Sequence, residues 1–345
     1  MIYFIFALIA LVSWSGSDLF SKKGTVQKDN SSHLRVIFAV GAIMGLHAII
    51  TLIVTALFGN KLLELDNAFL LSFFYTDFKP MDFLYYLPVA LLYLLAMGIG
   101  YVGLRYIELS ISSPICNASG SLALLLIAIL GAFGVFSEPV SLGVFEIIAV
   151  VLITFGIIWL GYVEYHEDDE IKKIRTQGKD FKYTSSLIAI LIPIIYLFLD
   201  AIATVGDEIV YDLEIFVSDY SANTAFEFTS LCFAIFAFIW VKFVKKQAFF
   251  KVNKEEVLED GTIVKKTVPF SKFLIIGGAC ETLGQIFYMA VVASPYVQFL
   301  PMISSYCVLS VVWSRIFLKE KLSFKHYIAI FATLVGIILL AILTE

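Results

Sequence analysis

Apolar runs of about 20 residues, separated by polar connections, make up most of the chain. A helix needs about 20 apolar residues to cross the hydrocarbon core of a bilayer, so each run predicts one membrane span. The first run begins at Met1 without the basic residues or cleavage site of a secretory signal, so we expect it to be retained. Ten spans are expected, at residues 2–21, 34–58, 83–106, 110–136, 142–163, 185–206, 220–243, 272–293, 296–317 and 325–343.

Composition supports this interpretation. Hydrophobic residues make up 60% of the 345 positions and charged residues 15%, and the mean hydropathy is +0.92. A soluble globule of this size needs more polar surface, so the predicted fold class is an all-α integral membrane protein. The four cysteines all lie inside apolar runs without a CxxC pair, so they are expected to be packing residues.

A pattern near the end of the chain also occurs, in weaker form, near its middle. In each copy a short turn carrying glutamate, Glu138 or Glu320, stands between two apolar runs, and Gly-Ile-Ile closes the second run. The spacings are similar, since Pro114 precedes Glu138 by 24 positions (138 − 114) and Pro295 precedes Glu320 by 25 (320 − 295). The chain is therefore predicted to be a duplication.

This arrangement of apolar helix, glutamate turn and closing Gly-Ile-Ile resembles the carboxyl-terminal signature of EamA-like transporters of the drug/metabolite transporter superfamily. The resemblance covers both halves and implies a transporter of small metabolites such as amino acids, amines, sugars or nucleotide conjugates. Trp14, followed by small and polar residues up to Lys22, resembles the family's cavity-lining pattern on the first helix. The counterpart in the second half, 200–208, lacks the tryptophan.

Five spans per half is an odd number, so the second half must enter the membrane in the opposite sense to the first. Transporters built from such inverted repeats bind substrate near the midplane, between the halves. The predicted organisation is a first five-helix repeat at 1–163, a charged cytoplasmic linker at 164–183 and a second repeat at 184–345. A working monomer is expected, because the two halves complete one another.

The basic residues predict the orientation. Every Lys and Arg except Lys61 and Lys79 lies in an odd-numbered connection or at the end of a span that adjoins one. The positive-inside rule therefore makes the odd connections cytoplasmic and places both termini outside. The apolar piece at 62–74 is too short to span and is expected to lie on the outer interface. The basic connection at 245–267 is expected to be a solvated cytoplasmic loop, and a plasma (inner) membrane location is expected.

Ionisable residues inside a span normally face a cavity or a partner, because lipid offers them no water. Glu281 lies deepest in its span, and Gln285 follows one turn later on the same helical face. His47 lies near the middle of the second span, and Glu227 lies towards the outer side of the seventh. Glu281, His47 and Glu227 are thus the candidates for proton coupling, although a structural hydrogen bond is the competing interpretation for each.

Aromatic and amide residues complete the candidate substrate site. Asn117 is the polar residue of span four most expected to contact a ligand, since the serines around it are more often packing residues. Five tyrosines could enclose a ligand or stack on a cation, although packing is the competing interpretation for each: Tyr93, Tyr101, Tyr196, Tyr288 and Tyr306. The acidic residues near helix ends are expected to reach water, and these are Asp18, Asp200, Asp207 and Glu208.

Several other chemistries have no visible motif. The sequence contains no HExxH, no phosphate-binding Gly-x-x-x-x-Gly-Lys-Ser/Thr loop and no Gly-x-Ser-x-Gly elbow, and its four histidines are scattered. No cofactor, metal or nucleic-acid partner is therefore expected. The predicted partners are membrane lipid and a small-molecule substrate.

The sequence thus predicts a secondary transporter, not an enzyme, that moves a small organic metabolite by alternating access and couples to protons. Acidic spans with few counter-charges favour a cationic or zwitterionic solute, amine or amino-acid-like. A sugar or nucleotide-sugar transporter of the same fold is one alternative. A membrane-embedded enzyme using Glu281 and His47 as an acid–base pair is another, and a scaffold or receptor without transport is a third.

Overall fold

The computed structural model describes residues 2–26, 29–136, 143–166, 187–212, 218–257, 263–292, 303, 306–320 and 322–343. The turn around Glu138, Pro295 and most of the predicted linker lie outside these residues. The first half contains helices α1 (Ile2–Gly24), α2 (Ser32–Leu65), α3 (Ala68–Phe74), α4 (Pro80–Gly103), α5 (Leu109–Asn117), α6 (Ser119–Ala132) and α7 (Val144–His166). The second half contains α9 (Leu187–Asp212), α10 (Asp219–Ile239) with a π-helical end (Trp240–Val244), strands β1 (Lys251–Val257) and β2 (Ile263–Pro269), α11 (Lys272–Val292), α13 (Tyr306–Phe317) and α14 (Phe324–Leu343).

Seven helical segments among the described residues are long and apolar enough to cross a membrane. They are α1, α2, α4, α5 together with α6, α9, α10 and α11, and shorter apolar segments of 10–17 residues lie in α7, α13 and α14. The protein is thus mostly helical, as expected of an all-α multi-pass membrane protein. The predicted interfacial piece at 62–74 divides, because α2 continues to Leu65 and the separate helix α3 begins at Ala68.

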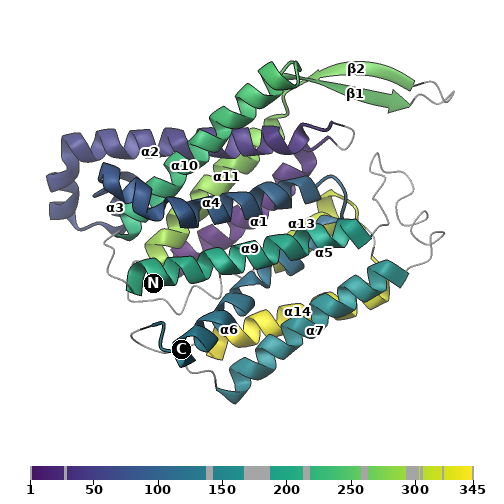
Figure 1. Cartoon of the computed structure of the whole chain (residues 1–345). Coiled ribbons are helices and arrows are strands. Elements are labelled where there is room, and N and C mark those ends of the chain that lie inside the picture. Colours follow the sequence, from purple (N-terminus) through teal and green to yellow (C-terminus); the bar gives the residue numbers. More distant parts are fainter. Residues whose placement is uncertain are drawn as a thin grey trace.

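Helices of the first half pack mainly against helices of the second half. Figure 1 shows α1 beside α11, α2 crossing α10, α4 beside α9 and α7 beside α14, and these pairs make extensive contacts. If the two halves exchange places, the pair α1–α11 becomes the pair α9–α4, whereas the α2–α10 and α7–α14 pairs map onto themselves. Exchanging the two halves therefore leaves this set of four helix pairs unchanged.

The crossing of α7 and α14 shows the same relation at the level of single residues. A Cβ added to Gly156 would lie 2.1 Å from Thr333 Oγ1 and 2.9 Å from the carbonyl of Ala329. A Cβ added to Gly336 would lie 2.6 Å from Ile153 Cγ1 and 2.8 Å from the carbonyl of Ala149. Gly336 follows Gly156 by 180 positions (336 − 156), and the contacted residues are offset by the same interval. The glycines of the two Gly-Ile-Ile motifs are thus the points of closest approach.

Alanine at Gly156 is expected to destabilise the fold by about 1–3 kcal/mol, because its methyl group forces α7 and α14 apart. Gly336→Ala should have a similar effect. Gly120→Ala is a matched control, since Gly120 is also helical and has no atom within 4 Å of its added Cβ. Thermal melting in detergent measures all three. An equal melting temperature for Gly156→Ala and Gly120→Ala would contradict the proposed close approach.

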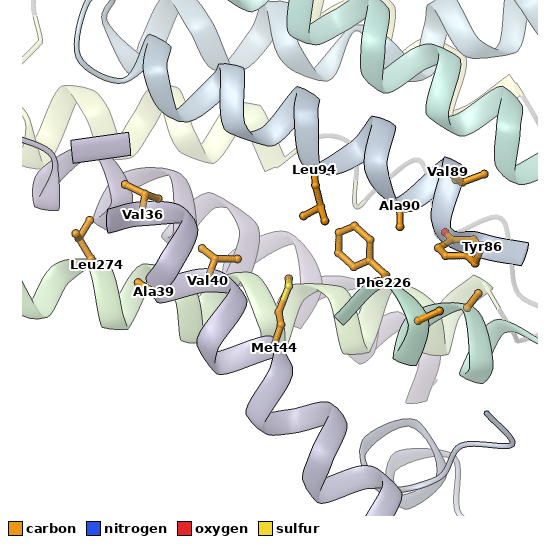
Figure 2. Close-up of a cluster of buried hydrophobic side chains, with 12 residues drawn as sticks. Val36, Ala39, Val40, Met44, Tyr86, Val89, Ala90, Leu94, Phe226 and Leu274 are labelled. Atoms are coloured by element: carbon orange, nitrogen blue, oxygen red, sulfur yellow. The ribbon is translucent and has the colours of Figure 1, made fainter. Parts of the chain in front are cut away.

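The largest apolar cluster joins α2 and α4 to α10 and α11. Figure 2 shows Phe226 of α10 directed between Leu94 and Ala90 of α4, with Met44 of α2 nearby. Lipid does not drive helices together as water does, so close packing of such side chains has to hold these helices in place. The cluster therefore fixes α4 and α10 against each other beside the cavity described below.

The sequence had led us to expect a solvated loop between α10 and α11. The structure instead has a β-hairpin in this connection. Strands β1 and β2 form an antiparallel hairpin in which Lys251 pairs with Pro269 and Val257 with Ile263. In Figure 1 the hairpin lies at the end of the bundle opposite to the two chain ends. Arg35 donates to the carbonyls of Ala248 and Phe249, so the first connection is tied to the base of the hairpin.

Candidate functional site

A cavity lies between helices of both halves. Its empty space is about 660 Å³ when the open mouth is counted with it. Helices α1, α4, α5, α9, α11 and α13 all contribute to its wall. Its polar and aromatic lining residues are Ser17, Asp18, Ser21, Tyr101, Ser112, Ser113, Cys116, Tyr196, Glu281 and Tyr306. Lys, Arg and His are absent from the described lining.

The carboxylate of Asp18 is held in this cavity by hydroxyls from two other helices. Ser113 of α5 and Ser310 of α13 each donate a 2.7 Å hydrogen bond to its Oδ2. The sequence had placed Asp18 among acidic residues that reach water at a helix end. The structure differs because α1 continues for six residues beyond Asp18, to Gly24, so the carboxylate lies inside the bundle.

Glu281 faces the same cavity from α11, as its depth in the span had suggested. Ser17, the neighbour of Asp18, forms a hydrogen bond with its side chain. Tyr101 and Ser21 also line the cavity, and their buried hydroxyl groups have no hydrogen-bond partner among the described residues. Two carboxylates and two residues with unpartnered hydroxyls therefore lie in the wall of one cavity.

Trp14, Tyr288 and Asn117 lie one layer behind this wall. The Trp14 ring packs on Tyr288 at 5.1 Å and on Tyr306 at 5.6 Å between ring centroids. Asn117 donates a 3.0 Å hydrogen bond to the carbonyl of Ser113 and forms another with Tyr306. These predicted residues therefore support Tyr306 and Ser113, which line the cavity themselves. Gln285 is half-buried on α11 and lies outside the lining.

The fourth predicted span is broken beside the cavity. Its helix stops at Asn117 and resumes at Ser119, and Pro114 lies within the first piece. Proline removes one backbone hydrogen bond, here the bond to the carbonyl of Ser110, so the first piece of the helix is also weakened on its N-terminal side. Ser119, just after the break, donates a 2.5 Å hydrogen bond to Asp200 of α9. The broken helix therefore contacts one carboxylate from each half, Asp18 through Ser113 and Asp200 through Ser119.

A further carboxylate on α9 is fully engaged by tyrosines. Asp207 accepts 2.7 Å hydrogen bonds from the hydroxyls of Tyr86 and Tyr93 on α4. The Tyr93 hydroxyl oxygen also lies 3.2 Å from Thr204 Oγ1. Asp207 thus joins α9 to α4 at the level of the apolar cluster in Figure 2, where Tyr86 is labelled.

His47 and Glu227 form a buried pair between α2 and α10. His47 Nδ1 lies 2.8 Å from both carboxylate oxygens of Glu227, and Nε2 lies 3.1 Å from the carbonyl of Phe73. Because the Phe73 carbonyl only accepts, Nε2 carries a proton, and a second proton lies between Nδ1 and Glu227. The pair therefore holds two protons in either arrangement.

His47 lines a second, smaller cavity together with residues of α10 and α11 such as Asn223 and Ile286. Glu281 lines the larger cavity instead. The two groups of the enzyme hypothesis thus face different spaces, and His47 is engaged by Glu227. Among the described residues, no group of three or more His, Cys, Asp and Glu could hold a metal ion.

The turn between α4 and α5 forms one end of the larger cavity and is held from both sides. Lys22, only 2% exposed, donates to the carbonyls of Leu104 and Ile107. Glu320, 1% exposed, accepts from the backbone N–H groups of Leu109 and Ser110 and from the Ser110 hydroxyl. A lysine at backbone carbonyls and a carboxylate at a helix N-terminus each complement the local charge.

Sequence reasoning found the turn that carries Glu320 but not its partner, because Leu109 lies 211 positions away (320 − 109) and no local pattern links them. Arg105 is close in sequence to the cavity residue Leu104, but it is not part of the described lining and donates to Asn30 at 2.9 Å. Its guanidinium is therefore directed towards the first connection. In comparison with known proteins, the chain matches no family model and no curated protein.

Proposed function

We propose that the protein is a secondary transporter that moves a small organic solute across the membrane by alternating access. The observation that carries this proposal is the polar cavity between the two halves, with Asp18 and Glu281 in its wall and no cation in its described lining. A solute bound there would contact α1, α4 and α5 from the first half and α9, α11 and α13 from the second. Movement of one half against the other would then change the side from which the cavity opens.

The proposed architecture is ten helices in two inverted five-helix repeats, as in the EamA-like group of drug/metabolite transporters. The reciprocal contacts of Gly156 and Gly336 support it, as does the exchange symmetry of the helix pairs. Asp200 follows Asp18 by 182 positions (200 − 18), and Glu320 follows Glu138 by the same interval (320 − 138). In this proposal α7, α13 and α14 belong to the fifth, ninth and tenth spans.

The membrane orientation proposed from the basic residues also has structural support. The first, third, seventh and ninth connections contact one another or neighbouring helix ends, through Arg35, Arg105, Lys22 and Glu320. These connections therefore gather at one end of the bundle. We propose that this end faces the cytoplasm of a plasma-membrane protein, with both termini on the other side.

We propose Glu281 as the residue that couples solute to protons, with His47 and Glu227 as a second titrating pair. A carboxylate in a solute site can release its proton when a cationic solute arrives and take it back when the solute leaves. Binding of solute and proton would then be mutually exclusive. The linkage is thermodynamically reciprocal, so a proton gradient can drive solute movement in the opposite direction.

Glu281→Gln is expected to reduce proton-driven solute flux at least tenfold, because the amide cannot exchange a proton at this position. The measurement is uptake into proteoliposomes with and without a pH gradient, using solutes selected by thermal shift from amines, amino acids, sugars and nucleotide sugars. A ligand of the folded protein raises its melting temperature with concentration.

Glu64→Gln on the exposed end of α2 is the matched control, and it should transport like the unchanged protein. Equal gradient-driven flux in Glu281→Gln would overturn the role of Glu281. If none of the four solute classes crosses the vesicle membrane in a protein-dependent manner, the transporter proposal itself fails.

A further inference from the structure

The charges around the cavity distinguish between the two kinds of ammonium-bearing solute, cationic and zwitterionic, that a transporter of this type could take. An amino acid presents an ammonium and a carboxylate, whereas an amine presents only the ammonium. The cavity has acceptors for an ammonium in Asp18 and Glu281. The question is whether it also has a place for a carboxylate.

Basic side chains do not provide that place. The described lining contains no Lys, Arg or His, and residues 293–305, which precede α13, contain none in their sequence. Lys22 is next to the cavity residue Ser21, but it is 2% exposed and its Nζ donates to Leu104 and Ile107. Arg105 is directed to Asn30.

Backbone N–H groups at a helix N-terminus are the other common anion site. Helix α5 begins at the cavity residue Leu109, so its N-terminus is the natural candidate. The Glu320 carboxylate already accepts from the N–H groups of Leu109 and Ser110, at 3.1 and 3.0 Å. A solute carboxylate would therefore have to displace a buried carboxylate of the protein itself.

The remaining wall is suited to an ammonium group. An ammonium only donates hydrogen bonds, and the cavity offers it carboxylate and hydroxyl oxygens. Both serines that hold Asp18 donate to Oδ2, so neither of these bonds engages Oδ1. Tyr101, Tyr196 and Tyr306 add aromatic rings that attract a cation, and the buried hydroxyls of Tyr101 and Ser21 are unpartnered among the described residues.

We infer that the cavity selects an organic amine that carries no carboxylate group, with its ammonium between Asp18 and Glu281. This inference rests on the proposed transport function and specifies the solute class within it. A carboxylate on the same solute would meet two like charges, and the described wall offers it neutral hydroxyls but no basic side chain. Discrimination therefore comes from repulsion as well as from attraction.

Matched pairs of solutes that differ only by the carboxylate test this inference directly. Tyramine with tyrosine and putrescine with ornithine are suitable, each measured by thermal shift and by competition in uptake. Each amine is expected to bind at least tenfold more tightly than its amino acid. Asp18→Asn and Glu281→Gln should each weaken amine binding at least tenfold, whereas Glu64→Gln should leave it unchanged.

Asp18→Asn retains an oxygen that can accept from Ser113 and Ser310, so it is expected to fold. Glu281→Gln provides an independent variant, and size-exclusion profiles verify both. The inference is overturned if the amino acids bind more tightly than the amines. It is also overturned if none of the four solutes binds. If amino acids are transported, the transport function stands and only the solute class changes. If amines bind without any flux, the solute class stands and the transport function fails.

Discussion

Replacing His47 by alanine is expected to destabilise the protein by about 3 kcal/mol, because Glu227 is then left buried without its main partner. Glu227 is 1% exposed, and both its oxygens face the His47 ring. Breaking a buried ion pair from one side typically costs 3–5 kcal/mol, since the remaining charge must be neutralised or stay unpaired. SDS-induced unfolding in mixed micelles measures the change.

The double variant His47→Phe with Glu227→Leu is expected to recover much of this loss, because it leaves no unpaired group. The coupling energy from the single variants His47→Phe and Glu227→Leu and from the double variant then isolates the pair. His166→Ala supplies a control, since His166 is exposed near the end of α7 and substitutions at exposed positions are usually within 0.5 kcal/mol. Additive effects of the two single substitutions would show that the pair contributes nothing.

Glu320→Ala is expected to destabilise the protein by about 2–3 kcal/mol, because it removes the acceptor for three donors. These are the N–H groups of Leu109 and Ser110 and the Ser110 hydroxyl. Hydrogen bonds to charged groups contribute about 1.5–3 kcal/mol each, and a buried donor without a partner costs its desolvation. The three bonds share one side chain, so their contributions do not add fully.

Glu320→Gln should have a smaller effect than Glu320→Ala, since its amide oxygen can still accept from one backbone N–H. Hydrogen exchange at Leu109 and Ser110 provides a local measurement, and it should accelerate in both variants. Glu64→Ala is the matched control, because Glu64 is exposed near the end of α2. Unchanged exchange at Leu109 and Ser110 in Glu320→Ala would show that another group caps α5.

The helices were predictable because a bilayer requires long apolar runs, and the predicted and observed limits of α4, α10 and α11 differ by a few residues. The sequence did not predict which face of each helix packs against protein, since a helix that is apolar on all sides has no periodicity to show it. Glu281 was found from its depth. Asp18 was missed because the predicted span ended at residue 21, which placed Asp18 close to a helix end. In the structure α1 continues to Gly24.

The hairpin β1–β2 and the break between α5 and α6 have related explanations. Both depend on contacts that local sequence does not record, such as the tie from Arg35 to Phe249 and the bond from Ser119 to Asp200. The sequence analysis expected one continuous span at 110–136, whereas the helix stops at Asn117 and resumes at Ser119. Chemistry at single positions was therefore easier to predict than the pairing of those positions.

The packing of each half against the other has a consequence for synthesis. Helix α1 emerges from the ribosome about 250 residues before its main partner α11 begins. His47 lacks Glu227 until α10 has entered the bilayer, and Asp18 lacks Ser310 until α13 has done so. The first half must therefore persist in the membrane with polar groups uncovered, and slower translation of the second half would lengthen its exposure to membrane proteases.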